Sequence, residues 1–278
     1  MWVAEIDRHV VGFRTFLRWE LLTPAGSVYR AVRAVDTATD PDFQGRGIFT
    51  ALTLGALEEL RAERVDFVFN TPNAQSRPGY LKMGWHEVGR LPVGIRPVGV
   101  RGWAMVRRAR VPADRHALAC DLGSPAAAVF ADVELCDTLL ASTPVAGGLA
   151  TRRSAAYLAW RYGHAPLHYR VVTVPGNPAG GAVVFHLRRR GPAVEAVICD
   201  VLDRVSAPRA VRPLLARIAA DSGADYLLGL RAPGDRAPSA GLLPAPRVGP
   251  ILTARALTRL PPSRVAGWAF TLGDIEAL

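Results

Sequence analysis

The chain has 278 residues, half of them hydrophobic, and 34 basic against 24 acidic residues give it a formal charge of +10. A chain of this length can bury one large core or two modest ones, and we expect two domains. No run of about 18 uncharged apolar residues occurs, which excludes a membrane-spanning helix. Glu5, Asp7 and Arg8 lie where a signal peptide would be apolar, so the sequence predicts a cytoplasmic protein without a membrane partner.

The positive charge comes almost entirely from arginine, since Lys82 is the only lysine. The arginines are scattered, and the two densest clusters, around Arg108 and Arg189, are short and lack interleaved aromatic residues. A solvated basic surface therefore explains the charge better than a nucleic-acid site. The cysteines are odd in number, far apart and without a CxxC pair, which predicts buried reduced thiols rather than disulfides or a zinc site: Cys120, Cys136 and Cys199.

Hydrophobic periodicity in the first hundred residues predicts a strand hairpin, a third strand, a helix and a fourth strand. The expected strands cover residues 2–6, 10–19, 29–38 and 65–70, and the expected helix covers residues 48–62. Within that helix, Ile48, Leu52, Ala56 and Leu60 fall on one apolar stripe. A short helix over residues 73–83 and a strand beginning at Trp85 follow.

The second half repeats this order of elements without a close sequence repeat. Helices are expected over residues 125–140, 154–162 and 208–220, and strands over residues 169–174, 181–188, 193–202 and 225–230. Because the pattern is weak between residues 106 and 124, we place a linker there. The expected organisation is a first lobe of residues 1–105, a linker of residues 106–124 and a second lobe of residues 125–278.

The most informative stretch is residues 37–60, where a strand runs into a Gly-rich turn that opens directly into a helix. The first turn of a helix leaves backbone N–H groups without partners, and together with the helix dipole they form an anion site. Gly45 and Gly47 permit a sharp bend and a close approach to a phosphate, and Arg46 adds charge. The turn lacks the Gly-Lys-Ser/Thr ending of a Walker loop and, with Thr50, the third glycine of a dinucleotide fingerprint.

These residues resemble the GNAT-type N-acetyltransferase superfamily. Its signature, Gln/Arg-x-x-Gly-x-Gly/Ala, is matched from Gln44 onward until Phe49, where a small residue is usual. The family also has an Asn, a Tyr seven residues later and a Gly-aromatic pair four residues after that, which is the spacing of Asn73, Tyr80 and Gly84-Trp85. With the approach Asp40-Pro41-Asp42-Phe43 and the early hairpin strand Val10-Val11-Gly12-Phe13, the resemblance covers about residues 2–90.

The resemblance implies an α/β fold with a mixed sheet, the GNAT-like acyltransferase fold, and an N-acyltransferase that moves an acetyl or other acyl group from acyl-CoA to a primary amine on a small molecule or peptide. It implies no metal. Backbone amides of the turn would hold the CoA pyrophosphate, and a strand edge exposed by two splayed strands would pair with pantetheine. The implied cofactor-binding residues are Thr37, Ala38, Thr39, Gln44, Gly45, Arg46, Gly47, Ile48, Phe49, Asn73 and Ser76.

The resemblance also implies that Tyr80 protonates the leaving thiolate, since a phenol pKa near 10 lies above a thiol pKa near 8.5. The alternative for Tyr80 is a half-buried aromatic residue with a hydrogen-bonded hydroxyl group. Asp36, late in the third strand, is the best local candidate for the general base, and Glu20 is another. A chain of waters is a further route for the proton of the amine.

Two departures leave a second function open. The family usually places a strand and one or two helices before the first hairpin, whereas Met1 directly precedes it, so we expect a first lobe without them. The second lobe resembles a degenerate GNAT-like lobe, since residues 204–208 replace the phosphate turn and Pro208 removes a donor. The alternative is therefore a non-catalytic GNAT-like protein that binds acyl-CoA or a partner. His164 and His168 are four residues apart, but the intervening Pro166 and the missing third ligand argue against a metal site.

Overall fold

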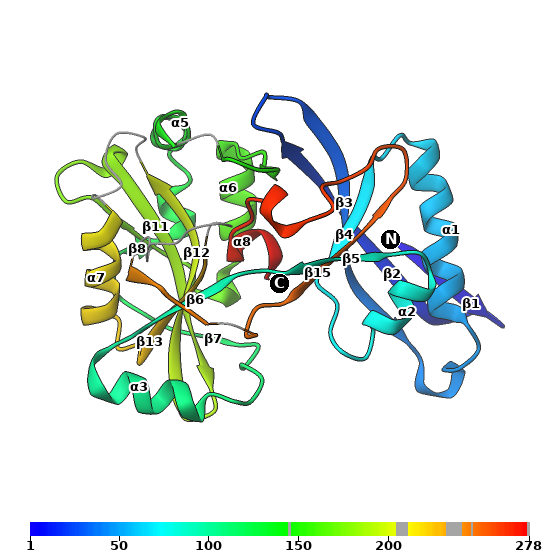
Figure 1. Cartoon of the computed structure of the whole chain (residues 1–278), viewed down its shortest axis with the longest axis horizontal. Helices are drawn as coiled ribbons and strands as arrows, with labels where there is room; N and C mark the ends of the chain where they lie inside the picture. Colours follow the sequence, from blue (N-terminus) through cyan, green and yellow to red (C-terminus); the bar gives the residue numbers. More distant parts are fainter. Residues whose placement is uncertain (144–145, 204–210, 232–240, 246, 277–278) are drawn as a thin grey trace.

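The computed structural model describes residues 1–143, 146–203, 211–231, 241–245 and 247–276. The chain forms two lobes that lie side by side, each built on a mixed β-sheet (Figure 1). The predicted α/β fold with two lobes is therefore confirmed. Among the described residues, none of the helices has both the length and the apolarity that crossing a bilayer requires.

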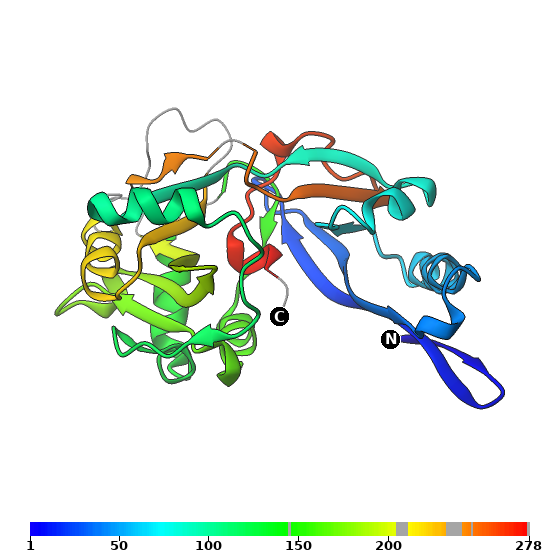
Figure 2. The same ribbon diagram turned by 90° about the horizontal axis from the view of Figure 1, so that it is seen from below.

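The first sheet has the strand order β1-β2-β3-β4-β15-β5, and β9 pairs with β2 outside this path. All neighbours are antiparallel except β3 and β4, which run parallel and are joined through a helix. The elements are β1 Trp2–Ile6, β2 His9–Leu22, β3 Val28–Thr39, the 3-10 turn η1 Pro41–Phe43, α1 Ile48–Ala62, β4 Phe67–Asn70, α2 Arg77–Lys82, β5 His86–Arg90, β9 Ala150–Thr151 and β15 Ile251–Ala256. Figure 2 shows the β1–β2 hairpin extending beyond the rest of this lobe.

Helix α1 begins and ends at the predicted residues, and it covers the face of the first sheet that points away from the second lobe (Figure 1). Ala56, Leu57 and Leu60 are buried in the core between this helix and the sheet. The helix approaches the sheet closely at Gly12 of β2, where an added Cβ would lie 2.9 Å from the Ile48 side chain. A larger residue at this point of β2 would therefore force the Ile48 side chain at the start of α1 to move.

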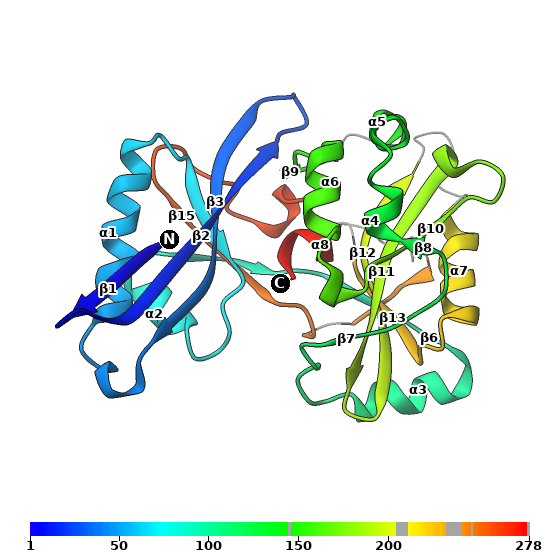
Figure 3. The same cartoon turned by 180° about the vertical axis from the view of Figure 1, so that it is seen from behind.

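The second sheet has the order β14-β6-β13-β12-β11-β10-β8, with β7 beside β11, and its one parallel pair, β12 and β13, is joined through a helix as in the first sheet. Figure 3 shows α5 and α6 on one side of this lobe and α7 on another. Its strands are β6 Val93–Pro97, β7 Ala117–Leu118, β8 Ser124–Pro125, β10 Arg170–Thr173, β11 Gly181–Arg190, β12 Ala193–Asp203, β13 Tyr226–Leu230 and β14 Leu243–Pro244. Its helices are α3 Gly99–Arg108, α4 Ala126–Val129, α5 Val133–Ser142, α6 Ala155–Tyr162, α7 Val211–Asp221 and α8 Leu272–Ile275.

The two halves of the chain exchange strands, so the sheets do not follow the expected division at residue 105. Strand β6 precedes residue 105 but pairs with β13 in the second sheet, and β15 belongs to the second half but lies between β4 and β5 in the first sheet. The expected linker, residues 106–124, contains β7 and the first residue of β8, which both pair within the second sheet. Strand β4 follows the crossover helix of the first sheet, and its outer partner, β15, comes from the second half of the chain. Strand β13 follows the crossover helix of the second sheet, and its outer partner, β6, comes from the first half.

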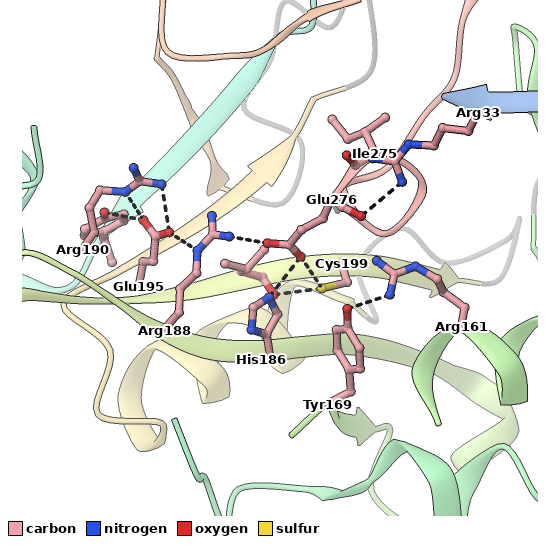
Figure 4. A network of polar contacts seen from close by, with 12 residues as sticks. Arg33, Arg161, Tyr169, His186, Arg188, Arg190, Glu195, Cys199, Ile275 and Glu276 are labelled. Carbon is pink, nitrogen blue, oxygen red and sulfur yellow. Dashed lines mark hydrogen bonds and ion pairs between the residues drawn. The ribbon is translucent and has the colours of Figure 1, made fainter. Parts of the chain in front are cut away.

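The C-terminal residues lie between the two sheets (Figures 1 and 3). Trp268 and Phe270 pack against Phe69 of β4, in one core that also includes Tyr162 of α6. Figure 4 shows the polar contacts at this place: Arg33 of β3 donates hydrogen bonds to the carbonyl oxygens of Ile275 and Glu276. Burial lowers the pKa of the Arg33 guanidinium to about 10. The two lobes therefore share both an apolar core and a buried polar contact.

The predicted buried thiols are partly confirmed. Cys136 and Cys199 are buried and Cys120 is half-buried, and all three are free. Cys120 lies in the segment that we expected to be a linker, and it lines a hollow together with Asp121.

Candidate functional site

A pocket of about 400 Å³ lies where β3 ends and α1 begins. It brings together every predicted cofactor-binding residue except Arg46, and Phe43, Gln75 and Gly79 complete its wall. The predicted residues that line it are Thr37, Ala38, Thr39, Gln44, Gly45, Gly47, Ile48, Phe49, Asn73 and Ser76. Their contact with a cofactor stays a prediction, but the fold places them on one surface.

The turn before α1 presents free amide groups to this pocket. Gly45 and Gly47 have φ angles of 74° and 79°, a left-handed conformation that favours glycine, and a Cβ added to either would meet no atom within 4 Å. Among the described residues, the backbone N–H groups of residues 45–50 donate to no protein acceptor. They lie at the positive end of the 15-residue helix α1. The turn therefore has the donors and the field that an anion requires.

Side chains hold the turn in this shape. The Asp40 carboxylate accepts from the backbone N–H of Asp42 at 2.9 Å, and the Gln44 side-chain amide donates to the Thr39 carbonyl oxygen at 3.3 Å. Arg46 donates to the Asp42 carbonyl oxygen at 3.2 Å, and its guanidinium lies 4.7 Å from the centre of the Phe43 ring. The Arg46 side chain thus folds back on the turn and does not line the pocket.

Strands β3 and β4 diverge beside the turn. They pair only from Ala31 to Arg33 of β3, whereas β3 continues to Thr39 with β2 as its sole neighbour among the described residues. A bulge between Arg14 and Phe16 of β2 marks the start of the unpaired edge. The result is a fork between the two parallel strands, which leaves backbone groups of β3 open to an extended ligand.

Asn73 forms the opposite wall of the pocket. Its side-chain oxygen accepts from the backbone N–H groups of Gln75 and Ser76 at 3.0 and 2.8 Å and from the Ser76 hydroxyl group at 3.0 Å. This Asx turn leads into α2. No protein acceptor among the described residues takes the Asn73 side-chain N–H₂ group, so it can donate to a ligand.

Tyr80 is 4% exposed and lies just behind the pocket wall, where its ring meets those of Phe49 and Trp85 edge-on at 5.5 and 5.1 Å. Phe49, the departure from the family signature, therefore lies between the pocket and the Tyr80 ring. Burial raises the pKa of the Tyr80 phenol above its ordinary value, and the Arg14 guanidinium and a hydrogen bond with Asn70 oppose that rise. Asn70 ends β4, so the Tyr80 hydroxyl group lies at the fork.

Arg14 is a further residue of the site, and the sequence pattern does not predict it. This β2 residue is fully buried and donates hydrogen bonds to the Tyr80 hydroxyl oxygen at 2.7 Å and to the Val35 carbonyl oxygen at 2.9 Å. An arginine within a strand that alternates polar and apolar residues reads as solvent-facing. Its burial becomes apparent only in the folded chain, where other elements cover this face of β2.

The two candidate bases lie apart. Asp36 is exposed on β3, next to the pocket residue Thr37, and its charge partly opposes the lowering of the Arg14 pKa by burial. Glu20 pairs with Arg152 at 2.9 Å and lines a separate hollow near Arg30. The structure therefore keeps Asp36 as a candidate near the fork and removes Glu20 from it.

Among the described residues, one cluster could ligate a metal: donor atoms of His186, Cys199 and Glu276 lie within 4.8 Å of one another (Figure 4). His186 and Arg188 already pair with the Glu276 carboxylate, and burial raises the pKa of the Cys199 thiol well above its ordinary value. The carboxylate thus already has side-chain partners, and the cluster is best described as a structural network. His164 and His168 belong to no such group, and the expected turn at residues 204–208 lies outside the described residues.

Comparison with known proteins finds similarity to acetyltransferases in the first lobe and in the fold. The family model of the acetyltransferase (GNAT) domain matches residues 1–88. Similar solved structures include GCN5-related N-acetyltransferases from Kribbella flavida (16% identity, 91% of this chain and 59% of that chain, TM-score 0.58) and Anabaena variabilis (13%, 92% and 62%, 0.63). Eis1 from Mycobacterium abscessus is also similar (20%, 92% and 63%, 0.53). The chain thus spans about three fifths of the length of these structures. No curated protein matches the sequence.

Proposed function

We propose that the first lobe, whose residues 1–88 match the acetyltransferase (GNAT) domain, binds acyl-CoA and transfers its acyl group to a primary amine. Acetyl-CoA is the first candidate donor, and the acceptor is an amine of a small molecule or a peptide. One observation carries the proposal: free amide groups at the start of α1 adjoin the open edge of β3 in a single pocket. A diphosphate joined to an extended amide-containing chain is the ligand that fits both features.

In this arrangement the CoA diphosphate accepts hydrogen bonds from the amides of residues 45–49, and pantetheine lies along residues 37–39. The Asn73 side-chain N–H₂ group donates to pantetheine, because its oxygen is already used in the Asx turn. The thioester then lies at the fork, where the open β3 edge is free to polarise its carbonyl group. We keep Arg46 outside this contact, since its side chain bonds to the turn itself.

The reaction we propose is direct attack. The amine nitrogen forms a bond to the thioester carbon, the C–S bond breaks, and Tyr80 protonates the leaving thiolate. The proton that the amine loses passes to solvent, with the exposed Asp36 carboxylate as the candidate base at the mouth of the fork. A phenol whose pKa burial holds above its ordinary value stays protonated at neutral pH and is thus available as an acid.

Calorimetry with acetyl-CoA, followed by a free-thiol release assay against amino sugars, polyamines and peptide N-termini, tests the proposal. Tyr80→Phe should lower kcat by about 10²–10⁴-fold and leave CoA affinity nearly unchanged, because the ring stays and only the donor is lost. Tyr29→Phe is the matched control, since Tyr29 packs on Phe67 at the other end of β3. It should keep its kcat.

Two results would count against the proposal. CoA binding without thiol release from any amine would favour the non-catalytic alternative. Full kcat in Tyr80→Phe, with a stability loss of about 1 kcal/mol, would make Tyr80 a core residue and water the proton donor.

A further inference from the structure

Arg14 is a buried cation without a carboxylate partner. It is 0% exposed, and among the described residues no carboxylate lies within salt-bridge distance of it. Aromatic rings surround it instead: its guanidinium carbon lies 4.5, 5.7 and 5.5 Å from the ring centres of Phe16, Phe49 and Tyr80. Burial lowers the pKa of this guanidinium, and its interactions with Tyr80 and Asp36 only partly compensate.

Two hydrogen bonds fix the guanidinium in place. One goes to the Val35 carbonyl oxygen, at the bulge where β3 leaves its partner β4, and the other goes to the Tyr80 hydroxyl oxygen. The buried Arg14 Nε–H group finds no acceptor within the part of the chain that the structure describes. The side chain thus bridges β3 and α2 across the fork, while its Nε–H group is left unsatisfied.

A purely structural role does not explain a charge at this position. Burying a cation costs several kcal/mol unless a negative group and hydrogen bonds compensate it, and a well-packed apolar residue of similar volume is often as stable or more so. Here the aromatic rings already supply an apolar environment in which Met or Leu would pack. The cation is therefore better explained by a negative charge that forms at the fork only during the reaction.

The direction of the Arg14–Tyr80 bond identifies that charge. A guanidinium has donors and no acceptor, so the Tyr80 oxygen accepts and its own hydrogen must point to another acceptor. When Tyr80 gives this hydrogen to a thiolate, the phenolate that remains lies 2.7 Å from a guanidinium nitrogen. A charge-assisted hydrogen bond of this kind is about twice as strong as a neutral one.

We infer that Arg14 is a positioning residue for acyl transfer: it directs the Tyr80 hydroxyl hydrogen toward the leaving sulfur and stabilises the Tyr80 phenolate after the proton has left. This inference rests on the proposed function. The O–H bond of Tyr80 breaks as the S–H bond of CoA forms, and the phenolate regains its proton from solvent, which receives the proton lost by the amine. Arg14 keeps all its protons and forms no covalent bond.

A double-mutant cycle tests whether Arg14 acts through Tyr80. Thiol release is measured for the parent, Arg14→Gln, Tyr80→Phe and the double variant, with kcat expressed per CoA-binding site counted by calorimetry, so that loss of folded protein cancels. Arg14→Gln should lower kcat by about 10- to 100-fold in the parent and by less than about 3-fold in Tyr80→Phe. Arg14→Lys, which keeps the charge, should recover part of the loss. Arg18→Gln is the control on the same strand, because Arg18 is exposed and pairs with Glu63 at the surface.

A spectroscopic measurement needs no acceptor. With 3,5-difluorotyrosine at position 80, whose phenol ionises closer to neutral pH, ¹⁹F NMR follows its titration directly. The midpoint should rise by about one pH unit or more in Arg14→Gln and less in Arg14→Lys, since an opposite charge at this distance lowers a pKa by roughly one to three units.

The outcomes separate the two proposals. An equal loss of kcat in both backgrounds, or an unchanged ¹⁹F midpoint in Arg14→Gln, would overturn the role of Arg14 while Tyr80 remained the acid. Full kcat in Tyr80→Phe would overturn the proposed acid itself, and the role of Arg14 with it.

Discussion

Substituting Gly47 by glutamate is the sharpest test of the phosphate site. The variant places a carboxylate beside the free amides at the start of α1, where an added Cβ meets no protein atom within 4 Å. If the CoA diphosphate lies there, its two nearest charges repel the carboxylate by about 1 kcal/mol each at about 4 Å in water. The sum of about 2 kcal/mol weakens CoA binding by about 30-fold.

The same substitution also strains the backbone, and this cost must be separated from the loss of affinity. Gly47 has a φ of 79°, a conformation that costs a residue with a Cβ about 1–2 kcal/mol. Gly26, in the turn between β2 and β3, has a φ of 80° and equally open surroundings but lies outside the pocket. Gly26→Glu therefore carries a similar strain and the same charge at a distance from the ligand.

The measurements are thermal unfolding without ligand and calorimetry with CoA at low and high salt. Both variants should lose about 2–4 °C in Tm, and only Gly47→Glu should lose CoA affinity. Higher ionic strength should reduce that loss, because the repulsion is partly screened at an exposed site. If Gly47→Glu and Gly26→Glu bound CoA equally well, the amides before α1 would not be the diphosphate site.

Two further predictions concern stability. Burial raises the pKa of Glu195, but hydrogen bonds from Arg190 and the charge of Arg188 outweigh this effect and hold the pKa below the ordinary value of 4.5. The ionised carboxylate therefore stabilises the folded state above that pH, and this stabilisation is lost as the pH falls through the folded pKa. Glu195→Gln should therefore unfold about 3 kcal/mol more easily than the parent at pH 7, and this gap should narrow as the pH falls through the folded pKa, as measured by urea unfolding across pH. Deleting residues 250–278 should abolish CoA binding and broaden thermal unfolding, because it removes β15 from between β4 and β5; retained micromolar binding would show that the first sheet tolerates the gap.

Local signals in the sequence predicted the parts of the site that are local in structure. Helix α1 begins and ends at the residues that its apolar stripe predicts. The turn before it contains the two glycines with positive φ at the predicted positions. Both features depend on residues close in the chain, namely Gly45, Gly47 and the buried positions Ala56 and Leu60. Predictions of this kind need no knowledge of distant partners.

The parts of the fold and the site that the sequence did not predict depend on pairing between residues far apart in the chain. Strands β6 and β15 are short, and β6 contains Gly94 and ends in Pro97, so neither has a strong strand pattern. Their partners lie well over a hundred residues away, which no local pattern records. Arg14 was missed for the same reason: its burial results from α1 and α2, which cover that face of β2.

The exchange of strands has a consequence for the site, because residues of the second half fix both sides of the fork. On one side, Arg33, the last β3 residue to pair with β4, bonds to the carbonyl oxygens of Ile275 and Glu276. On the other side, Thr253 of β15 donates its hydroxyl hydrogen to the side-chain oxygen of Asn70, the residue that ends β4. The separation of the strands that would receive a thioester is thus set by contacts to residues 253–276. The second half of the chain would thus be required for the geometry of the first lobe even without a ligand of its own.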